Sequence, residues 1–303
     1  MPIFDSEKFL NEYRIETHPA GSKNVPSGCV GICCPFCGDG SNHMHFRLKG
    51  FYVRCWRCGP HKLLSVVSRL LRVSEMEARA IIAPFISDSP ATPQSAQPRV
   101  FASTVKLPGG TGVLMEIHQR YLLDRQFDPF KIEREWGIKG TNHIDPYYKF
   151  RIVAPVYVNN QMVSYQARDV TNMQAPPYRA CRPEDEVMSH KDVLYGTDLA
   201  RGTSIVVVEG ITDAWRLGSG AVATFGVKWT VAQAMKIVQH PYWNRVFILY
   251  DADEAGQVGG VTLFHFLRGF MNNVELLELS EFSDPGSMPD VEARYLMRKE
   301  LKI

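Results

Sequence analysis

Two short apolar runs stand out in the hydrophobic pattern of the chain. Residues Ser204–Val208 and Val246–Tyr250 are rich in Val, Ile and other apolar residues, and a stretch with helical spacing follows each run. Continuous apolar runs of this length are typical of strands that are buried in a parallel sheet. Because ligands bind at the carboxyl ends of the strands in such sheets, the pattern predicts an α/β fold with a site where these two strands end.

The same pattern predicts elements elsewhere in the chain. Helical spacing in residues 61–85 predicts a helical hairpin in which Ser74 caps a helix. Residues 112–136 predict two short helices. Residues 149–170 predict two strands that are joined by a turn at Asn159–Asn160.

Composition divides the chain into two domains. Residues 87–104 are rich in Pro, Ser, Ala and Gln and lack periodicity, which predicts a flexible linker. The 303 residues, 45% of them hydrophobic, suffice for a domain over residues 1–86 and another over residues 105–303. No apolar run approaches the roughly 18 residues of a membrane span and no secretory leader is present, so we expect neither membrane insertion nor secretion.

Acidic residues follow both apolar runs. Glu209 and Asp213 come after the first run, and Asp251 and Asp253 come after the second. Strand side chains alternate, so Asp251 and Asp253 are expected to point the same way. Carboxylates that converge without cations repel one another, and hard divalent cations relieve that repulsion. The pattern predicts a Mg²⁺ or Mn²⁺ site that acts on phosphates, although single acidic residues in such places also cap helices or face solvent.

Two Cys-x-x-Cys motifs form the second chemical pattern. A gap of 17 residues separates them, which is the spacing of a four-cysteine zinc ribbon. The predicted zinc ligands are Cys34, Cys37, Cys55 and Cys58. A redox dithiol is the competing interpretation, but it needs only one such motif. The use of seven cysteines in this way fits a reducing cytosol.

Residues 40–74 contain Lys, Arg and aromatic side chains but no Asp or Glu, although the net charge of the whole chain is only +2. Cations for phosphates and aromatic faces for bases are what a surface for single-stranded nucleic acid requires. The residues that we expect to recognise a template are His43, His45, Arg57 and Trp56. Aromatic residues beside a zinc ribbon also often form its small core, an alternative that applies most to Phe46 and Phe51.

The acidic motifs carry a family resemblance. A Glu-Gly pair followed three residues later by Asp, then a strand ending in Asp-x-Asp with Ala-Gly just after it, resembles the Toprim fold of DnaG-type primases, topoisomerases and some nucleases. Residues 221–238 are similar to the primase branch. The resemblance implies an α/β fold in which an N-terminal four-cysteine zinc ribbon is tethered to a Toprim-containing RNA polymerase domain. Within that domain, residues 105–200 would form a basic subdomain and residues 201–303 the Toprim part.

The resemblance also implies roles for residues outside the two acidic clusters. Asp284 is implied as a further catalytic, magnesium-binding carboxylate, because it lies in a segment similar to the family's Asp-Pro loop, where Ser283 stands in place of the usual Lys. The residues implied in nucleotide or template binding are Arg151, Arg168, Lys191 and Lys228. The family's further Lys falls on Pro177, for which Arg179 or Arg182 are the candidate substitutes.

The function that this resemblance implies is that of a DNA primase of bacterial or phage type. Such an enzyme is a DNA-directed RNA polymerase, a nucleotidyltransferase that makes short RNA primers on single-stranded DNA for replication, with structural Zn²⁺ and catalytic Mg²⁺ or Mn²⁺. The sequence has no G-x-x-x-x-G-K-[ST] motif, so a replicative helicase is expected to act in trans. The implied partners are single-stranded DNA and ribonucleoside triphosphates, and the implied location is the cytoplasm of a bacterial cell, with a phage gene as the source.

Two other classes of function remain open. A Toprim nuclease would keep the carboxylates but would need neither the zinc ribbon nor the Arg168 and Lys191 subdomain. A non-catalytic zinc-ribbon DNA-binding protein would need no intact acidic residues, whereas Glu209, Asp213, Asp251 and Asp253 are all present.

Overall fold

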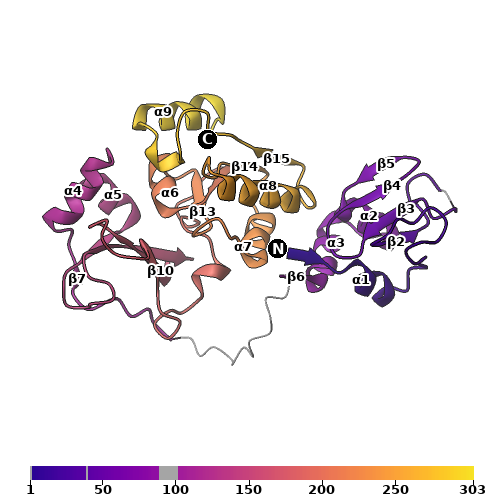
Figure 1. Cartoon of the computed structure of the whole chain (residues 1–303), viewed down its shortest axis with the longest axis horizontal. Helices are drawn as coiled ribbons and strands as arrows, with labels where there is room; N and C mark the ends of the chain where they lie inside the picture. Colours follow the sequence, from indigo (N-terminus) through magenta and orange to yellow (C-terminus); the bar gives the residue numbers. More distant parts are fainter. Residues whose placement is uncertain (1, 39, 89–101) are drawn as a thin grey trace. The chain divides into compact units, whose positions relative to one another are not determined.

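A computed structural model describes residues 2–38, 40–88 and 102–303. The chain divides into two compact units (Figure 1), of which one comprises Met1–Pro93 with Thr262–Asn273 and the other Gln94–Val261 with Val274–Ile303. Among the described residues, no helix combines the length and the apolar character needed to cross a membrane.

An antiparallel sheet of four strands and a helical hairpin form most of the first unit. The strands are β2 (Cys29–Ile32), β3 (Met44–Arg47), β4 (Val53–Cys55) and β5 (Gly59–His61), in that order across the sheet. The helices are α1 (Ser6–Glu12), α2 (Leu63–Leu71) and α3 (Glu75–Ile82), followed by a 3₁₀ turn at Ala83–Phe85. The predicted hairpin is confirmed, and Ser74 forms a capping box in which its backbone N–H donates to the Glu77 carboxylate at 2.8 Å.

The end of the first unit extends into the predicted linker. Strand β1 (Pro2–Phe4) pairs antiparallel with β6 (Ile86–Asp88), so residues 87 and 88 belong to a strand. Ala102 donates its backbone N–H to the carbonyl of Glu186 in the second unit. Residues 89–101 of the predicted linker lie outside the described residues.

The second unit begins with two helices and a five-stranded antiparallel sheet. The helices are α4 (Glu116–Asp124) and α5 (Pro129–Trp136). The strands are β7 (Thr111–Gly112), β8 (Lys139–Thr141), β9 (Arg151–Val158), β10 (Gln161–Asp169) and β11 (Tyr178–Ala180), in the spatial order β11-β10-β9-β8-β7. The predicted helices and hairpin are confirmed, and Asn159 and Asn160 have φ values of 53° and 62°, as a tight hairpin turn requires.

A mixed layer of parallel strands and helices follows. The strands are β12 (Ser204–Val208), β13 (Ala221–Ala223), β14 (Arg245–Ile248) and β15 (Asn273–Leu276), in the order β13-β12-β14-β15. The helical segments are α6 (Ile211–Leu217), α7 (Val231–Gln239), α8 (Glu254–Arg268) and α9 (Asp290–Tyr295), with 3₁₀ turns at His190–Asp192 and Pro285–Ser287 and a π-helical turn at Leu296–Glu300. Strand β12 is parallel to both β13 and β14, as predicted, but β14 ends two residues earlier than expected.

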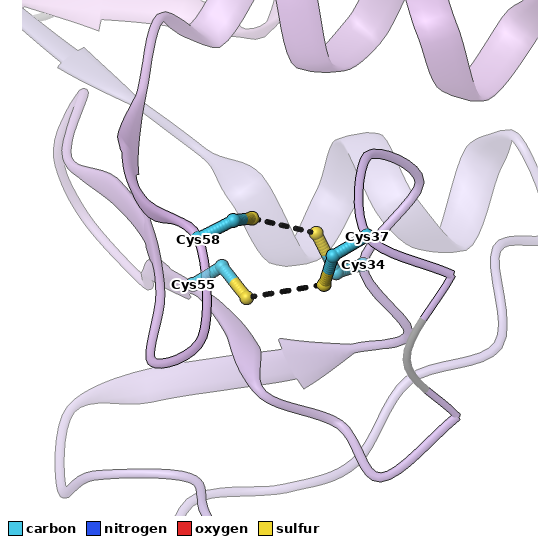
Figure 2. A group of neighbouring side chains, drawn as sticks. All are labelled: Cys34, Cys37, Cys55 and Cys58. Carbon is cyan, nitrogen blue, oxygen red and sulfur yellow. Dashed lines mark hydrogen bonds between the residues drawn. The ribbon is translucent and has the colours of Figure 1, made fainter.

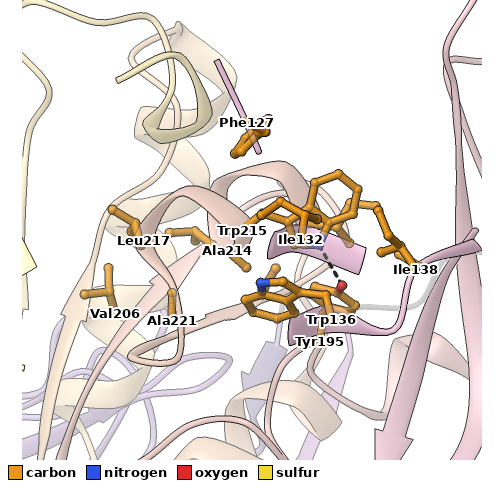
Figure 3. Packing of buried hydrophobic residues seen from close by; sticks show 14 of the residues in the cluster. Phe127, Ile132, Trp136, Ile138, Tyr195, Val206, Ala214, Trp215, Leu217 and Ala221 are labelled. Atoms are coloured by element: carbon orange, nitrogen blue, oxygen red, sulfur yellow. Dashed lines mark hydrogen bonds between the residues drawn. The ribbon is translucent and has the colours of Figure 1, made fainter. Parts of the chain in front are cut away.

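One hydrophobic core joins the two sheets of the second unit (Figure 3). The ring of Trp136 on α5 stacks on Tyr195 at a centroid distance of 5.1 Å. The Tyr195 hydroxyl accepts a 2.7 Å hydrogen bond from Trp215 Nε1 on α6. This packing fixes α6, and with it the carboxyl end of β12, against α5.

Candidate functional site

The four predicted zinc ligands lie together in the first unit. The sulfur atoms of Cys34, Cys37, Cys55 and Cys58 all lie within 4.8 Å of one another (Figure 2). One pair comes from the turn after β2, and the other comes from the end of β4 and the turn before β5. Four thiolates that converge from two tight turns match the ligand set of a structural zinc site.

Backbone N–H groups donate hydrogen bonds to sulfur in this cluster and so stabilise the thiolate form. The Arg57 N–H donates to Cys55 Sγ at 3.4 Å, and Cys34 Sγ lies 3.6 Å from Cys58 Sγ. Burial opposes ionisation of Cys55, but backbone N–H donors and neighbouring thiols outweigh burial and lower its pKa to about 7. Burial raises the pKa of Cys34, and burial together with the neighbouring thiols raises the pKa of Cys58. Four thiolates this close repel one another, and a divalent cation offsets that repulsion, so the cluster fits Zn²⁺.

An exposed aromatic and cationic surface is formed by Tyr52, Arg54 and Trp56, in β4 and directly on either side of it. We call this surface the β4 face. Strand alternation places these three side chains on the same side, while Val53 and Cys55 are buried. The Trp56 side chain is 54% exposed, and its Nε1 donates to the carbonyl of Asn24 at 2.9 Å. The Arg54 guanidinium lies 5.7 Å from the Trp56 ring centroid. Tyr52 and Arg54 were not predicted individually, although the alternation from 52 to 56 identifies them.

The expectation that His45 is available to bases is wrong. Its side chain is only 4% exposed, and its ring lies 5.2 Å from that of Trp56 and 6.2 Å from that of Tyr52. The buried His45 ring therefore packs against the side chains of the β4 face. His43 is half-buried and its carbonyl accepts from the Trp56 N–H, whereas Arg57 is exposed in the second Cys-x-x-Cys turn.

The second unit contains a cavity of about 290 Å³ at the carboxyl end of β12, which we call the acidic pocket. Its lining comprises Arg125, Gln166, Arg168, Tyr178, Glu209, Gly210, Thr212, Asp213, Phe225, Gly226, Asp251 and Asp284. The fold thus brings together four of the predicted carboxylates and Arg168 from distant parts of the sequence.

Two carboxylates of the acidic pocket have the properties of cation ligands. Burial and then the charges of Asp251 and Asp253 raise the pKa of Glu209 to about 7. Burial and then the charges of Asp284 and Asp253 raise the pKa of Asp251 to about 6. Glu209 Oε2 and Asp251 Oδ1 are buried without a hydrogen-bond partner among the described residues. Because a hard divalent cation satisfies such oxygens and offsets their repulsion, this part of the pocket fits Mg²⁺ or Mn²⁺.

Asp213 has a different environment from the other carboxylates. Its Oδ2 accepts from the Gly210 N–H at 2.7 Å, and its Oδ1 accepts from the Gly286 N–H at 3.0 Å. Burial raises its pKa to about 8. These bonds fasten the start of α6 to the turn that carries Asp284, so Asp213 positions the pocket in addition to lining it.

The prediction that strand alternation orients Asp251 and Asp253 is wrong. Strand β14 ends at Ile248, and both residues lie in the loop after it. Asp253 Oδ1 accepts from the Gly256 N–H at 2.7 Å and caps α8, and its side chain does not line the acidic pocket. A Cβ atom at Gly256 would lie 2.4 Å from the Asp251 carbonyl oxygen, so the loop requires glycine there. The charge of Asp253 nevertheless acts on Glu209 and Asp251.

Two arginines line the acidic pocket. The Arg168 guanidinium lies 5.6 Å from the ring of Tyr121 and 4.7 Å from the ring of Tyr178, which hold it between them. The Arg125 Nη2 lies 3.9 Å from Asp284 Oδ1. Sequence reasoning missed Arg125 because it sits at the end of α4, a place where basic residues are common for helix capping alone.

Lys191 lies beside the pocket and does not line it. Its Nζ donates to the carbonyls of Phe225 and Lys228 at 3.4 and 3.1 Å. Burial lowers its pKa, and the charge of Glu209 opposes this effect. The Lys191 carbonyl accepts from Thr230 Oγ1 at 2.6 Å, which fixes the segment to α7. The side chain of Lys228 is exposed and also does not line the pocket.

The expectation that Arg151 contacts a nucleotide or template is not supported. Its side chain is fully buried and donates to the carbonyls of Ala167, Pro176 and Pro177 at 3.1–3.3 Å. It therefore fastens the segment before β11 to β10. The proposed substitutes for the missing Lys, Arg179 and Arg182, lie 3.9 and 4.9 Å from the ring of Tyr147 and do not line the acidic pocket.

We predict that Arg151 and Arg168 respond differently to replacement by Met. Arg151→Met leaves buried carbonyls unpaired and should lower the free energy of unfolding by about 1–3 kcal/mol, measured by chemical denaturation. Arg168→Met should change stability little but weaken binding of nucleotide or single-stranded DNA about tenfold. The assignment of Arg151 to folding fails if its variant unfolds like the parent protein but loses DNA binding.

The acidic pocket should make thermal stability depend on pH and Mg²⁺ together. In the unfolded chain these carboxyls have their ordinary pKa values of 4.5 for Glu and 3.8 for Asp, whereas in the folded protein burial and neighbouring charges raise the pKa of Glu209 to about 7 and that of Asp251 to about 6. Metal-free protein should lose stability as the pH rises through this window, because the folded state holds more protons than the unfolded state. Mg²⁺ should therefore raise the melting temperature more at about pH 8 than at about pH 5.

The matched variants are Asp251→Asn and, as a control, Glu116→Gln, which changes an exposed carboxylate on α4. Without Mg²⁺ at high pH, Asp251→Asn should melt above the parent protein and show a smaller response to Mg²⁺. Glu116→Gln should behave like the parent. An equal Mg²⁺ response for all three proteins in calorimetry would contradict a cation site at Asp251.

Comparisons with known proteins agree with the architecture. No protein-family profile matches the chain. A DNA primase of Clostridium acetobutylicum is 29% identical over 147 residues, which cover 46% of this chain and 24% of that protein. The match thus spans about a quarter of the relative's length.

Two solved structures share the fold. The zinc-binding and RNA polymerase domains of Aquifex aeolicus primase match with a TM-score of 0.50 and 18% identity, over 96% of this chain and 82% of that chain. The RNA polymerase domain of Mycobacterium tuberculosis primase DnaG matches with a TM-score of 0.50 and 19% identity, over 62% of this chain and 80% of that chain. The resemblance inferred from the sequence motifs is confirmed: the chain has the α/β fold of the zinc-binding and RNA polymerase domains of DnaG-type DNA primases.

Proposed function

We propose that this protein is a DNA primase, a DNA-directed RNA polymerase that synthesises short RNA primers on single-stranded DNA. The fold and the primase relative support this proposal. The observation that carries it is the acidic pocket, in which unpaired oxygens of Glu209 and Asp251 share one cavity with Arg125 and Arg168. Carboxylates for metal ions and arginines for phosphates are the groups that nucleotidyl transfer requires.

Glu209, Asp251 and Asp284 are the residues that we propose to hold the catalytic Mg²⁺ or Mn²⁺, with Asp253 contributing charge. When bound, such an ion neutralises the triphosphate and activates the attacking hydroxyl. In the reaction, the 3′-hydroxyl oxygen bonds to the α-phosphorus of the incoming nucleotide, pyrophosphate leaves, and the hydroxyl proton is released.

The basic residues would bind and orient the substrates. Tyr121 and Tyr178 restrict the Arg168 guanidinium, and this restriction lowers the entropy that is lost when it binds a phosphate. Arg125 is held near Asp284 and would exchange that contact for a phosphate oxygen. Lys191 offsets the charge of Glu209 from beside the pocket and keeps the loop after β13 in place.

In the first unit, zinc would be structural and the β4 face would bind the template. Trp56 and Tyr52 offer exposed rings for base stacking, and Arg54 and Arg57 offer cations for phosphates. We therefore propose that this unit selects where a primer starts, while the acidic pocket forms the phosphodiester bond. We further propose that a replicative helicase acts with this protein in trans. The proposed location is the cytoplasm of a bacterial cell, and the proposed source is a phage gene.

The direct test is ribonucleotide incorporation on single-stranded DNA by the full chain, with and without Mg²⁺. Asp251→Ala should reduce primer synthesis at least about 100-fold, because each 1.4 kcal/mol of lost transition-state stabilisation costs a factor of ten and a metal supplies several. Binding of single-stranded DNA should persist, since it depends on separate basic groups. Glu116→Gln, which changes an exposed carboxylate outside the pocket, is the control.

Two outcomes would overturn the assignment. Primer yield from Asp251→Ala close to that of the parent protein would remove the acidic pocket from the reaction. Metal-dependent strand cleavage without ribonucleotide incorporation would instead identify a nuclease.

Start-site selection should depend on the β4 face and not on the acidic pocket. Trp56→Ala removes an exposed stacking surface worth about 1–3 kcal/mol per base, so it should weaken initiation at preferred template positions about 10- to 100-fold. Extension of a supplied primer should be nearly unchanged. Met76→Ala, at an exposed residue elsewhere in the first unit, is the control. If Trp56→Ala initiates at the same positions and rates as the parent protein, the β4 face does not read the template.

A further inference from the structure

His61 lies against one of the four zinc-ligand cysteines. It ends β5, three residues after Cys58, and its Nε2 lies 3.0 Å from Cys58 Sγ. Cys37 and Cys58 are exposed, whereas Cys34 and Cys55 are buried, so His61 contacts one of the two exposed ligands.

A stack of side chains holds the His61 ring in this orientation. The imidazole lies parallel to the ring of Phe36, with 4.2 Å between centroids and 13° between planes. Phe36 belongs to the first Cys-x-x-Cys turn, between Cys34 and Cys37. The guanidinium of Arg69 on α2 lies 5.6 Å from the Phe36 ring, and its Nε donates to the Pro35 carbonyl at 3.2 Å. The stack therefore ties the first turn and α2 to the residue that touches Cys58.

The direction of the hydrogen bond follows from the chemistry of a metal-bound thiolate. A thiolate on zinc has lost its proton, so it accepts hydrogen bonds and cannot donate them. His61 must then carry its proton on Nε2 and donate it to Cys58 Sγ. A ligand held by such a neighbour keeps its orientation, and part of its negative charge is neutralised.

We propose that His61 is a positioning residue of the zinc site, which donates Nε2–H to the Cys58 thiolate and does not itself bind the metal. In the part of the chain that the structure describes, the group whose ligand atoms lie within 4.8 Å of one another consists of the four thiols, a complete tetrahedral set for zinc. The proposal rests on the assignment of zinc to the cysteine cluster, which metal analysis of the parent protein tests separately from primer synthesis.

The test uses the full chain and measures zinc directly. We expect His61→Ala to bind one zinc ion per chain, as the parent protein does. In competition with a chromophoric chelator, its apparent affinity for zinc should be about 10- to 100-fold weaker than that of the parent protein, the usual effect of losing such a neighbour. Among the four ligand cysteines, Cys58 should become the first to react with an alkylating reagent, as located by mass spectrometry; Cys33, which is exposed and not a ligand, should react alike in all variants. His18→Ala, a histidine elsewhere in the first unit, is the control.

Two further variants separate the hydrogen bond from the stack. His61→Phe keeps an aromatic ring against Phe36 but has no N–H, so it should lose zinc like His61→Ala. His61→Gln keeps an N–H donor without the ring and should recover part of the affinity. Recovery by Phe and not by Gln would overturn the hydrogen-bonding role.

Other results would also overturn the proposal. If Cys58→Ala retains one zinc ion per chain and loses it only when His61 is also replaced, His61 is a ligand. If His61→Ala retains zinc as tightly as the parent protein, the contact has no role. A parent protein without zinc would reject the proposal together with the zinc assignment, while primer synthesis by the acidic pocket could still be measured.

Discussion

Mutual repulsion among half-buried carboxylates is the constraint on which the second unit depends. Glu209 and Asp251 sit where burial and neighbouring charges oppose ionisation, and each has an oxygen without a partner among the described residues. The surrounding structure makes this arrangement possible. Asp213 uses both of its oxygens to join the start of α6 to the turn at Asp284, and Lys191 places a positive charge beside Glu209. An isolated set of such carboxylates would spread apart or take up protons, so the fold holds a geometry that becomes favourable only with a cation.

The two candidate metal sites differ in their ligands and in what the protein supplies around them. The cysteine cluster offers soft thiolates from two tight turns, and N–H donors such as that of Arg57 stabilise the sulfur charge before any metal binds. The acidic pocket offers hard oxygens at the end of a parallel strand, and Arg125 and Arg168 line the same cavity. The first set could surround a single ion, whereas the second lines a cavity of about 290 Å³ beside two arginines. This difference supports a structural role for zinc and a catalytic role for Mg²⁺ or Mn²⁺.

Contacts with aromatic rings determine where several arginine side chains of this protein lie. Arg168 is held between two tyrosines within the acidic pocket, whereas Arg179 and Arg182 are drawn to Tyr147 and lie outside it. In the first unit, Trp56 and Tyr52 cover His45 and leave Arg54 exposed beside them. Pro177 stands where the family has a Lys. Among the residues that line the described pocket, Arg125 and Arg168 are the basic ones, and we propose that they bind phosphate.

The sequence by itself determined the elements and the chemical classes. Apolar runs predicted β12 and the position of β14, Ser74 and Asn159–Asn160 predicted a cap and a turn, and cysteine spacing predicted one metal cluster, because each of these depends on residues close together in the chain. Tertiary structure decided which charged side chains are accessible. Arg151 is buried against carbonyls, Asp213 is bonded to two backbone N–H groups, Arg125 reaches the acidic pocket from α4, and His61 touches Cys58 through its stack on Phe36. The physical reason is that burial and hydrogen-bond partners of a charged group come from segments distant in sequence, so its residue type and spacing cannot specify them.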